Sequence, residues 1–270
     1  MALIHIENVS VAYGSPSRPV LSNVDLSIEE GEFVCLLGQT GCGKSTLLRL
    51  VLGSERPTAG RVLIDGVERR QPDRTCGFVP QKYSLFPDKT VLGNITFGPE
   101  VNEFHLLSCL TPRYFRRRSQ FRQEAMGYIR RLGLQHADAA KYPEQLSGGM
   151  QQRVAMAQAL INKPRILLLD EAFSALDPGT RKDMQRLIRQ LWQDTGITVI
   201  FVTHNTQEAL YLSSRVIVLA KEAPDQGSRI ALELPVPELC PEVQISTMVT
   251  RLDFASGCAR QPEDAAFATA

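Results

Sequence analysis

The chain has 270 residues, of which 43% are hydrophobic and 22% charged, and these proportions fit a folded globular protein and exclude an intrinsically disordered one. The formal net charge is +1, so no overall positive field favours nucleic acid, and we expect no nucleic-acid partner. The six cysteines form no C-x-x-C pair, which argues against a zinc site or a disulfide framework and indicates reduced thiols in a cytosolic protein.

The first part of the chain predicts two strands, a buried strand and a helix. Leu3–Ile6 and Val24–Ile28 alternate apolar and polar residues, which indicates half-buried strands. Phe33–Leu37 is a continuous apolar run, which is typical of a strand buried on both faces. A glycine-rich turn follows directly, and helical periodicity then runs from Leu47 to Gly53, where we expect the helix to end.

The glycine-rich turn reads GQTGCGKS and matches the pattern G-x-x-x-x-G-K-[ST] without a mismatch. Glycines allow backbone N–H groups to turn inward around phosphate oxygens, and the following helix adds the positive end of its dipole. We expect Lys44 to reach the β and γ phosphates and Ser45 to offer a hydroxyl to Mg²⁺. Cys42 occupies a spacer position whose oxidation or alkylation would block nucleotide. The expected nucleotide-binding residues are Gly38, Gln39, Thr40, Gly41, Cys42, Gly43, Lys44, Ser45 and Thr46.

The middle of the chain changes character, because the segment from about 81 to 164 has a mostly helical pattern. Ser147 is placed as the N-cap of its last helix. The elements expected here and just before are strands at Arg61–Ile64 and Gly77–Val79, a hairpin turn at Asp65-Gly66, and helices at Arg122–Leu132 and Gly148–Ile161.

The second half alternates strands and helices, which predicts an α/β fold with a mainly parallel sheet, and the early alternating strands indicate an added antiparallel portion. Pro178 suits the first turn of a helix. Residues 255–270 are expected to be frayed. The expected strands are Ile166–Leu169, Thr198–Val202, Arg215–Leu219 and Arg229–Leu234, and the expected helices are Pro178–Trp192 and Gln207–Leu212.

Two acids follow the apolar strand at Ile166–Leu169, where a parallel strand delivers its last side chains to the ligand-binding edge of the sheet. Asp170 suits Mg²⁺ binding, and Glu171 suits polarisation of an attacking water. His204 follows another apolar strand and can donate to the γ-phosphate, and Gln81 follows a strand from which it can reach Mg²⁺ or the water. Taken singly, these are also a solvated strand end, a structural histidine and an ordinary loop residue.

The run Leu146–Arg153, LSGGMQQR, resembles the signature motif of ABC ATPases in the form common among prokaryotic importers. A serine and two glycines at a helix start also form a second anion-binding site on physical grounds. The resemblance covers about residues 2–220. It implies adenine stacking by Tyr13, nucleotide contacts by Ser147, Gly148, Gly149 and Gln151, a Q-loop role for Gln81, Mg²⁺ binding by Asp170, a catalytic base at Glu171, a D-loop at Ser174–Asp177 and a switch histidine at His204.

The same resemblance implies a P-loop NTPase (RecA-like) core with an inserted helical subdomain. The implied domains are an ATPase domain at 1–234, with the helical subdomain at 81–164, and a partly disordered tail at 235–270. The implied ligands are ATP and Mg²⁺. The implied partners are a second copy of the chain, which closes over the nucleotide, integral membrane permease subunits and, indirectly, a solute-binding protein, with the chain peripheral on the cytoplasmic face of the membrane.

Three positions depart from the family pattern. Ala172 stands where proline is typical, Gln158 where arginine is frequent and Asn205 where aspartate is frequent. None of them removes a group that touches phosphate, so we expect hydrolysis. The chain looks most like the nitrate, sulfonate and taurine branch of importers, and two segments, Tyr83–Pro99 and Asp177–Trp192, resemble relatives linked to urea- or guanidine-type compounds.

Aromatic residues between Gln81 and Ser147 either line the groove that receives a helix of the membrane subunit or pack the subdomain core; they are Phe86, Pro87, Phe97, Phe104 and Tyr114, with one proline among them. A basic cluster lies nearby, which indicates a solvated face, with anionic lipid headgroups as the second interpretation; it consists of Arg113, Arg116, Arg117, Arg118 and Arg122. The rival classes are a soluble ABC protein of translation or repair, an exporter ATPase, an unrelated P-loop kinase, and pairing with a different ATPase.

Overall fold

A computed structural model describes residues 2–14, 18–82, 85–103, 112–221, 223, 225–237 and 242–256. The chain divides into two compact units, one made of residues 1–73 with 191–270 and the other of residues 74–190. Within the described residues, no helix has the length and apolarity to cross a membrane.

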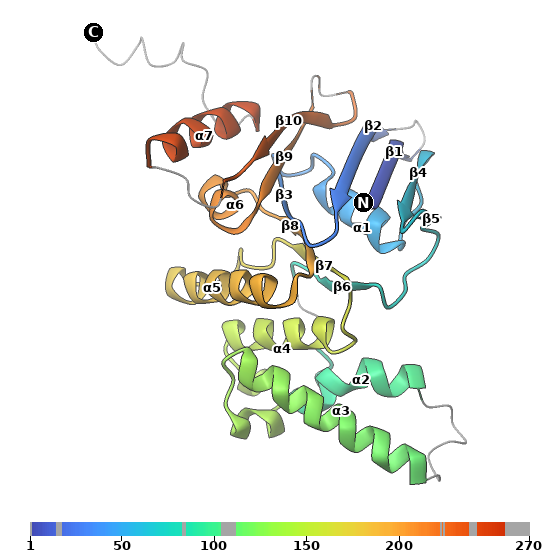
Figure 1. Ribbon diagram of the computed structural model, residues 1–270, viewed down its shortest axis with the longest axis vertical. Coiled ribbons are helices and arrows are strands. Elements are labelled where there is room, and N and C mark those ends of the chain that lie inside the picture. Colours follow the sequence, from blue (N-terminus) through green and yellow to red (C-terminus); the bar gives the residue numbers. More distant parts are fainter. Residues whose placement is uncertain are drawn as a thin grey trace. The chain divides into compact units, whose positions relative to one another are not determined.

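The first unit contains an antiparallel sheet in the order β2-β1-β4-β5 (Figure 1). The two long strands run past their predicted ends, because the register shifts at Asn8 and Asn23, both with positive φ, bend the pairing without ending it. Asp65 and Gly66 form the predicted hairpin turn, with φ of 53° and 74°. The strands are β1 (Ala2–Tyr13), β2 (Arg18–Glu29), β4 (Ala59–Ile64) and β5 (Val67–Glu68).

The same unit carries the strand that leads into the glycine-rich turn. This strand, β3 (Phe33–Leu37), is parallel to both of its neighbours, β8 (Thr198–Val202) and β9 (Arg215–Ala220), and β10 (Arg229–Pro235) pairs antiparallel with β9. Every residue of β3 and β8 is buried, as their continuous apolar runs predict. The mixture of parallel and antiparallel strands confirms the expected α/β fold.

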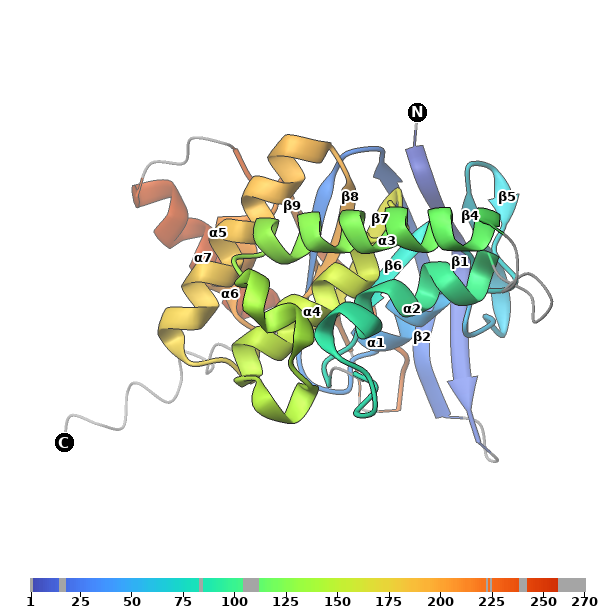
Figure 2. The ribbon, with the colours of Figure 1, turned by 90° about the horizontal axis from the view of Figure 1, so that it is seen from below.

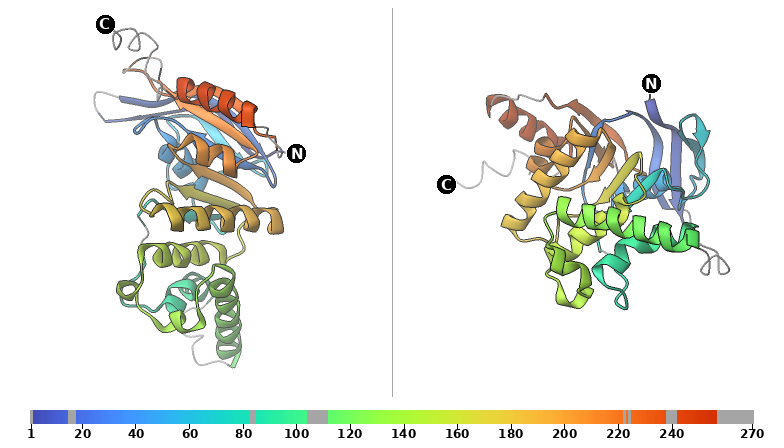
Figure 3. Two further views of the ribbon diagram at one scale, coloured as in Figure 1. Left: turned by 90° about the vertical axis from the view of Figure 1, so that its left-hand side faces the viewer. Right: turned by 60° about the horizontal axis from the view of Figure 1, so that its bottom comes forward.

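Three helices complete this unit: α1 (Lys44–Leu52), α6 (Thr206–Leu212) and α7 (Glu242–Ala255). Gly53 ends α1 as predicted, with φ of 83° and its N–H bonded to the carbonyls of Arg49 and Leu50. The last helix, α7, packs against α6, β9 and β10 (Figures 1 and 3). The sequence left the structure of this tail undecided.

The second unit joins two parallel strands, β6 (Cys76–Val79) and β7 (Ile166–Asp170), to a group of helices. Of these, α2, α3 and α4 pack on one another (Figure 2). The helix at 112–131 begins ten residues before its predicted start. The sequence did not predict its first two turns, because they are rich in arginine and carry no clear apolar stripe. The helices are α2 (Val91–Glu103), α3 (Pro112–Arg131), α4 (Gly148–Leu160) and α5 (Pro178–Thr195), with short 3-10 turns η2 (His136–Ala140) and η3 (Pro143–Gln145).

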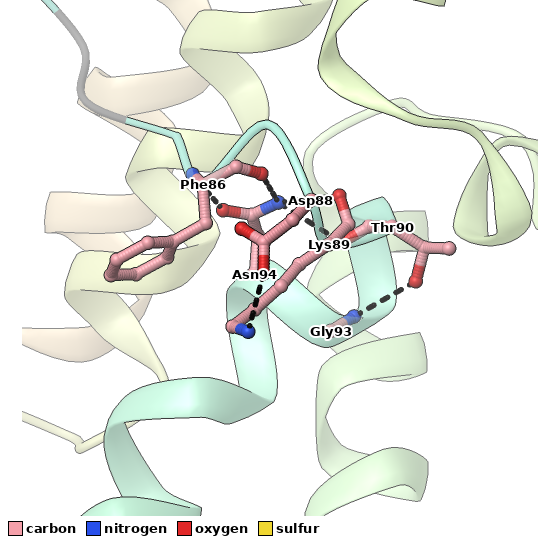
Figure 4. Close-up of polar contacts among 6 residues, drawn as sticks. All are labelled: Phe86, Asp88, Lys89, Thr90, Gly93 and Asn94. Atoms are coloured by element: carbon pink, nitrogen blue, oxygen red, sulfur yellow. Dashed lines mark hydrogen bonds and ion pairs between the residues drawn. The ribbon is translucent and has the colours of Figure 1, made fainter.

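A buried amide organises the segment that precedes α2. Asn94 is fully buried, and its Oδ1 accepts the N–H of Phe86 at 2.7 Å (Figure 4). Its Nδ2 donates toward the carbonyls of Phe86, Lys89 and Thr90 at 3.0–3.1 Å. This side chain therefore supplements the backbone hydrogen bonds of the irregular segment, such as the bond from the N–H of Lys89 to the carbonyl of Phe86 at 3.2 Å.

The expected boundaries at 81–164, 1–234 and 235–270 stay predictions. The compact unit that holds the predicted helical segment is wider than that segment, because it spans residues 74–190 and includes β6, β7 and most of α5. Two local predictions are confirmed: Pro178 opens α5, and Ser147 caps α4 by accepting the N–H of Met150 at 3.3 Å.

Candidate functional site

The loop between β3 and α1 has the backbone shape that encloses an anion. Gly38, Gly41 and Gly43 have φ of 154°, 81° and 94°, conformations that favour glycine. A Cβ on Gly38 would collide with the carbonyl oxygen of Leu219 and the sulfur of Cys42. The glycines therefore let the loop curl tightly ahead of a helix whose first N–H groups have no intrahelical partners.

The amine of Lys44 is held inside this loop. The side chain is only 4% exposed, and its Nζ donates to the carbonyls of Gly38 at 2.7 Å and Gln39 at 2.9 Å. These bonds hold a desolvated positive charge beside the loop backbone. A phosphate bound by the loop would have a strong electrostatic contact with this charge. Gln39 and Thr40 are exposed at the loop tip.

Cys42 is a buried residue of the loop and is not a reactive thiol. It is buried, and its sulfur lies 3.9 Å from Lys44 Nζ. Burial raises the pKa of the thiol, and the nearby ammonium of Lys44 opposes that shift only in part. At neutral pH Cys42 is therefore a packed, protonated spacer, as its place in the motif indicates.

The first turn of α1 supplies two hydroxyls. Ser45 is half-buried, whereas Thr46 is buried and its Oγ1 accepts from Arg49 Nη2 at 3.2 Å. Thr46 thus contributes to the site through its backbone more than through its side chain.

His204 leaves the sheet at the same edge as the loop. Leu36 of β3 pairs with Val202 of β8. Gly38 and His204 each lie two residues beyond that pair. The N–H of Thr203 donates to the carbonyl of Leu36 at 3.2 Å. Because adjacent parallel strands deliver their carboxyl ends to one side, the loop and this exposed histidine occupy one ligand-binding edge.

Asn205, one of the three departures from the family pattern, has a structural role as a helix cap. Its side chain accepts the N–H of Glu208 at 3.0 Å and caps α6. Asparagine and aspartate cap helices about equally well, so the replacement keeps this local structure.

Tyr13 ends β1 and is 43% exposed, which leaves its ring available to a flat ligand. Its hydroxyl donates to Glu55, which also accepts from Arg49 Nε at 3.0 Å. Burial raises the pKa of Glu55. The bond to Glu55 fixes the ring of Tyr13 at the surface of the first unit.

In the second unit, Gln81 and Glu171 meet at the end of β6 and β7. Val79 pairs with Leu169, and Gln81 and Glu171 each lie two positions beyond their residue of that pair. Gln81 Nε2 donates to Glu171 Oε2 at 3.0 Å. Glu171 has φ of 44°, an uncommon conformation for a residue with a side chain. Asp170, the last residue of β7, is half-buried.

Gln152 is a buried contact of this segment that sequence analysis missed. It lies on α4, is fully buried, and its Nε2 donates to the carbonyl of Ala172. The other amide atom, Oε1, is buried without a hydrogen-bond partner. The only signal in the sequence was its place in the run LSGGMQQR, three residues beyond the second glycine. The helix of the signature run is thereby tied to the backbone directly after Glu171.

The signature residues open onto a pocket of about 380 Å³ within the second unit. Ser147 and Gly148 are exposed at the start of α4, and Gly149 is so close to Thr180 that a Cβ would press on its methyl group. Gln151 Nε2 donates to the carbonyl of Pro143 at 2.9 Å, which anchors the turn before the helix. The pocket is lined by Gly133, Leu134, Gln135, Asp138, Lys141, Ser147, Gly149, Met150, Arg153 and Thr180.

The predicted D-loop, Ser174–Asp177, is held by hydrogen bonds to the helix that follows it. Asp177 Oδ2 accepts the N–H of Thr180 at 2.9 Å, and this bond holds the pKa of the Asp177 carboxyl below its usual value. Arg181 donates to the carbonyls of Ser174 and Leu176.

Several aromatic and basic residues of α2, α3 and the segment before α2 contact one another or acidic side chains. The rings of Phe86 and Phe97 lie 4.5 Å apart, and Lys89 lies over both. Arg117 and Arg118 form ion pairs with Glu103 and Glu100 of α2, and they also lie over the rings of Phe121 and Tyr114. Arg116 and Arg122 are exposed. Phe104 and the side chain of Arg113 lie outside the described residues, as does the start of the segment Tyr83–Pro99.

The oxygen-rich residues suit Mg²⁺. The hydroxyl of Ser45, the carboxylate of Asp170 and the amide oxygen of Gln81 are hard donors of the kind Mg²⁺ prefers, and this ion usually takes few protein ligands. The described residues contain no group of three or more His, Cys, Asp or Glu side chains able to hold a metal.

Comparison with known proteins places these features in a family. The family model described as ABC transporter matches residues 21–174. The aliphatic sulfonates import ATP-binding protein SsuB of Zymomonas mobilis is 41% identical over 83% of this chain and 83% of its own length. The nitrate import ATP-binding protein NrtD of Synechococcus elongatus is 38% identical over 86% and 81%, respectively. The spermidine/putrescine import ATP-binding protein PotA of Haemophilus ducreyi is 38% identical over 93% and 67%.

A solved structure has a similar fold. The dimeric ATP-binding cassette MJ0796, bound to ADP and Pi, superposes with a TM-score of 0.72 at 32% identity, covering 87% of this chain and 100% of that chain.

Proposed function

The chain belongs to the ABC transporter family, and on that premise we propose that it binds and hydrolyses ATP to drive an importer of a small polar solute. The observation that carries the proposal is the loop Gly38–Thr46, a tight glycine-rich curl with a buried ammonium on its axis. A loop of this shape binds phosphate groups through its backbone and its lysine. Similar import ATPases support the coupling to transport.

We assign roles to the residues by what their positions allow. Lys44 and the loop N–H groups bind the phosphates, and His204 donates to the γ-phosphate from the same sheet edge. Glu171, held by Gln81, polarises the attacking water. Catalysis of this kind comes mainly from positioning and from stabilisation of charge in the transition state. Tyr13 stacks on adenine.

Mg²⁺ is proposed to bind through Ser45, Asp170 and Gln81, whose oxygen donors fit it. Such an ion neutralises charge on the β and γ phosphates. The protein residues themselves orient the nucleotide and the water.

The proposed partners follow from the second anion-binding element. We propose that two copies of the chain close over ATP, each lending Ser147, Gly148 and Gly149 to the nucleotide of the other; the dimeric form of MJ0796 supports this. Integral membrane subunits would convert closure into transport, with a solute-binding protein on the other side of the membrane and this chain on the cytoplasmic face.

The proposed solute class follows from the names of the relatives. Similar relatives are named for sulfonates, nitrate and polyamines, so we propose a nitrogen- or sulfur-containing solute of the nitrate, sulfonate and taurine type, with urea- or guanidine-type compounds as the alternative. Identification of the ligand of a solute-binding protein encoded beside this gene would decide between them.

The Glu171→Gln variant tests the proposed reaction. It keeps the hydrogen bond to Gln81 but lacks a base, so we expect ATP binding to persist while phosphate release falls by about 10²–10⁴-fold. Light scattering should then show an ATP-dependent dimer. Glu144→Gln, an exposed change in the same unit, is the control. Near-normal turnover by Glu171→Gln would refute the assignment, and failure of the chain to co-purify with any integral membrane protein would favour a soluble ABC protein.

A further inference from the structure

The C-terminal helix is joined to the segment that carries His204. In the first unit, α7 packs against α6, β9 and β10 (Figure 3). Leu252 is fully buried in that contact, and Ser256 is 3% exposed. Ser256 Oγ donates to the carbonyl of Asp253 at 3.1 Å and closes the end of the helix. One face of the helix is thus packed into the unit.

The backbone on both sides of His204 is fixed by hydrogen bonds. Before it, Thr203 Oγ1 donates to Glu208 Oε2 at 2.5 Å and accepts the N–H of Asn205 at 3.1 Å. After it, Asn205 caps α6 through the N–H of Glu208. Thr203 and Glu208 are buried, so the bond between them is shielded from water.

One further hydrogen bond joins this segment to α7. Thr206, the first residue of α6, is 8% exposed, and its Oγ1 donates to Asp253 Oδ1 of α7 at 2.5 Å. A bond from a hydroxyl to a carboxylate is charge-assisted and stronger than a neutral one. The two residues are 47 positions apart, so only the packing of α7 brings them together.

We propose that α7 positions His204 for catalysis, with Asp253 acting through Thr206. The inference rests on the proposed role of His204 at the γ-phosphate. A helix of seven residues is too short to be stable by itself, so its first turn depends on external contacts. His204 lies only two residues before that turn and its side chain is exposed, so its placement follows the backbone that α7 anchors.

Four substitutions in the full-length chain separate positioning from packing. Thr206→Val and Asp253→Leu remove the bond, whereas Thr206→Ser and Asp253→Asn keep a donor and an acceptor of similar shape. Phe254→Ala changes an exposed side chain of the same helix and serves as the control. We expect the first pair to lower kcat about fivefold or more with the KM for ATP nearly unchanged, because a small misplacement of a catalytic group lowers the rate and not the binding. The second pair and the control should stay within about twofold.

The decisive measurement repeats Asp253→Leu and Thr206→Val in a His204→Ala background, under single-turnover conditions so that slow rates remain measurable. If α7 acts through His204, neither change should lower the rate further, because coupled residues are non-additive. The same fold loss in both backgrounds would overturn the inference and leave a structural role.

Two other results are distinguishable. If His204→Ala is impaired but Asp253→Leu and Thr206→Val are not, the inference alone fails. If His204→Ala turns over ATP normally, the role of His204 in the proposed function fails and the inference fails with it. Circular dichroism of each variant verifies that it folds, and the isosteric Thr206→Val keeps the test valid if Asp253→Leu is unstable.

Discussion

Replacing Asn94 with aspartate tests how much of the segment after Gln81 depends on one amide. The change keeps the size of the side chain and the oxygen that accepts the N–H of Phe86. It replaces the Nδ2 donor by an oxygen that faces the carbonyls of Phe86, Lys89 and Thr90 (Figure 4). The amide has two hydrogens, so at least two buried hydrogen bonds are lost.

The loss of these bonds sets the unfolding free energy that Asn94→Asp should lose. Each net hydrogen bond contributes about 1 kcal/mol. The carbonyls of Phe86 and Thr90 keep the backbone N–H donors of Lys89 and Asn94, so only the carbonyl of Lys89 loses its donor, which costs about 1–3 kcal/mol. Because the site is fully buried, we expect the variant to lose about 3–5 kcal/mol of unfolding free energy. For a protein of this size that corresponds to a fall in Tm of about 6–20 °C.

Thermal unfolding followed by circular dichroism measures this loss. Asn162→Asp provides a matched control, because Asn162 is exposed and the same change there should cost no more than about 0.5 kcal/mol. If Asn94→Asp and Asn162→Asp melt at the same temperature, the hydrogen bonds of Asn94 do not stabilise the chain and the reasoning is wrong.

Three further predictions concern the candidate site. Lys44→Ala should weaken ATP binding at least about tenfold by fluorescence titration, because a desolvated charge is removed, whereas the exposed Lys182→Ala should not; equal affinities would contradict the assignment. Cys42, whose burial raises its pKa, should react with iodoacetamide at least about tenfold more slowly than a free thiol near neutral pH and faster as pH rises, measured by mass spectrometry; rapid labelling would show that the loop opens. Gln152→Leu should lower turnover about tenfold with little change in ATP affinity, since Ala172 loses its donor; an unchanged kcat would make that bond a packing feature only.

Local patterns in the sequence predicted the parts of the fold that depend on few neighbours. The apolar runs of β3 and β8 are buried throughout, since a strand buried on both faces needs no alternation. Gly53 ended α1 because only a residue free to adopt positive φ makes that turn cheaply. The phosphate loop was predictable for the same reason, because its chemistry lies in one continuous stretch.

Long-range contacts explain what the sequence did not predict. The length of β1 depends on pairing through bulges, which interrupt the alternation that marks a strand. The roles of Asn94, Gln152 and Asp253 depend on partners that only packing brings near. Asn94 was indistinguishable from a solvated amide, and Gln152 was marked only by its place in the run LSGGMQQR. Nothing near Asp253 indicated Thr206 as its partner.

Glu171 carries a consequence for how this protein tolerates change. A side chain at φ of 44° costs about 1–2 kcal/mol relative to a glycine, which adopts that backbone freely. Random mutagenesis screened only for heat resistance should therefore enrich glycine at this position. Such variants would be more stable to heat than the parent but would lack the carboxylate. Thermal stability and ATP turnover therefore favour different residues at this position.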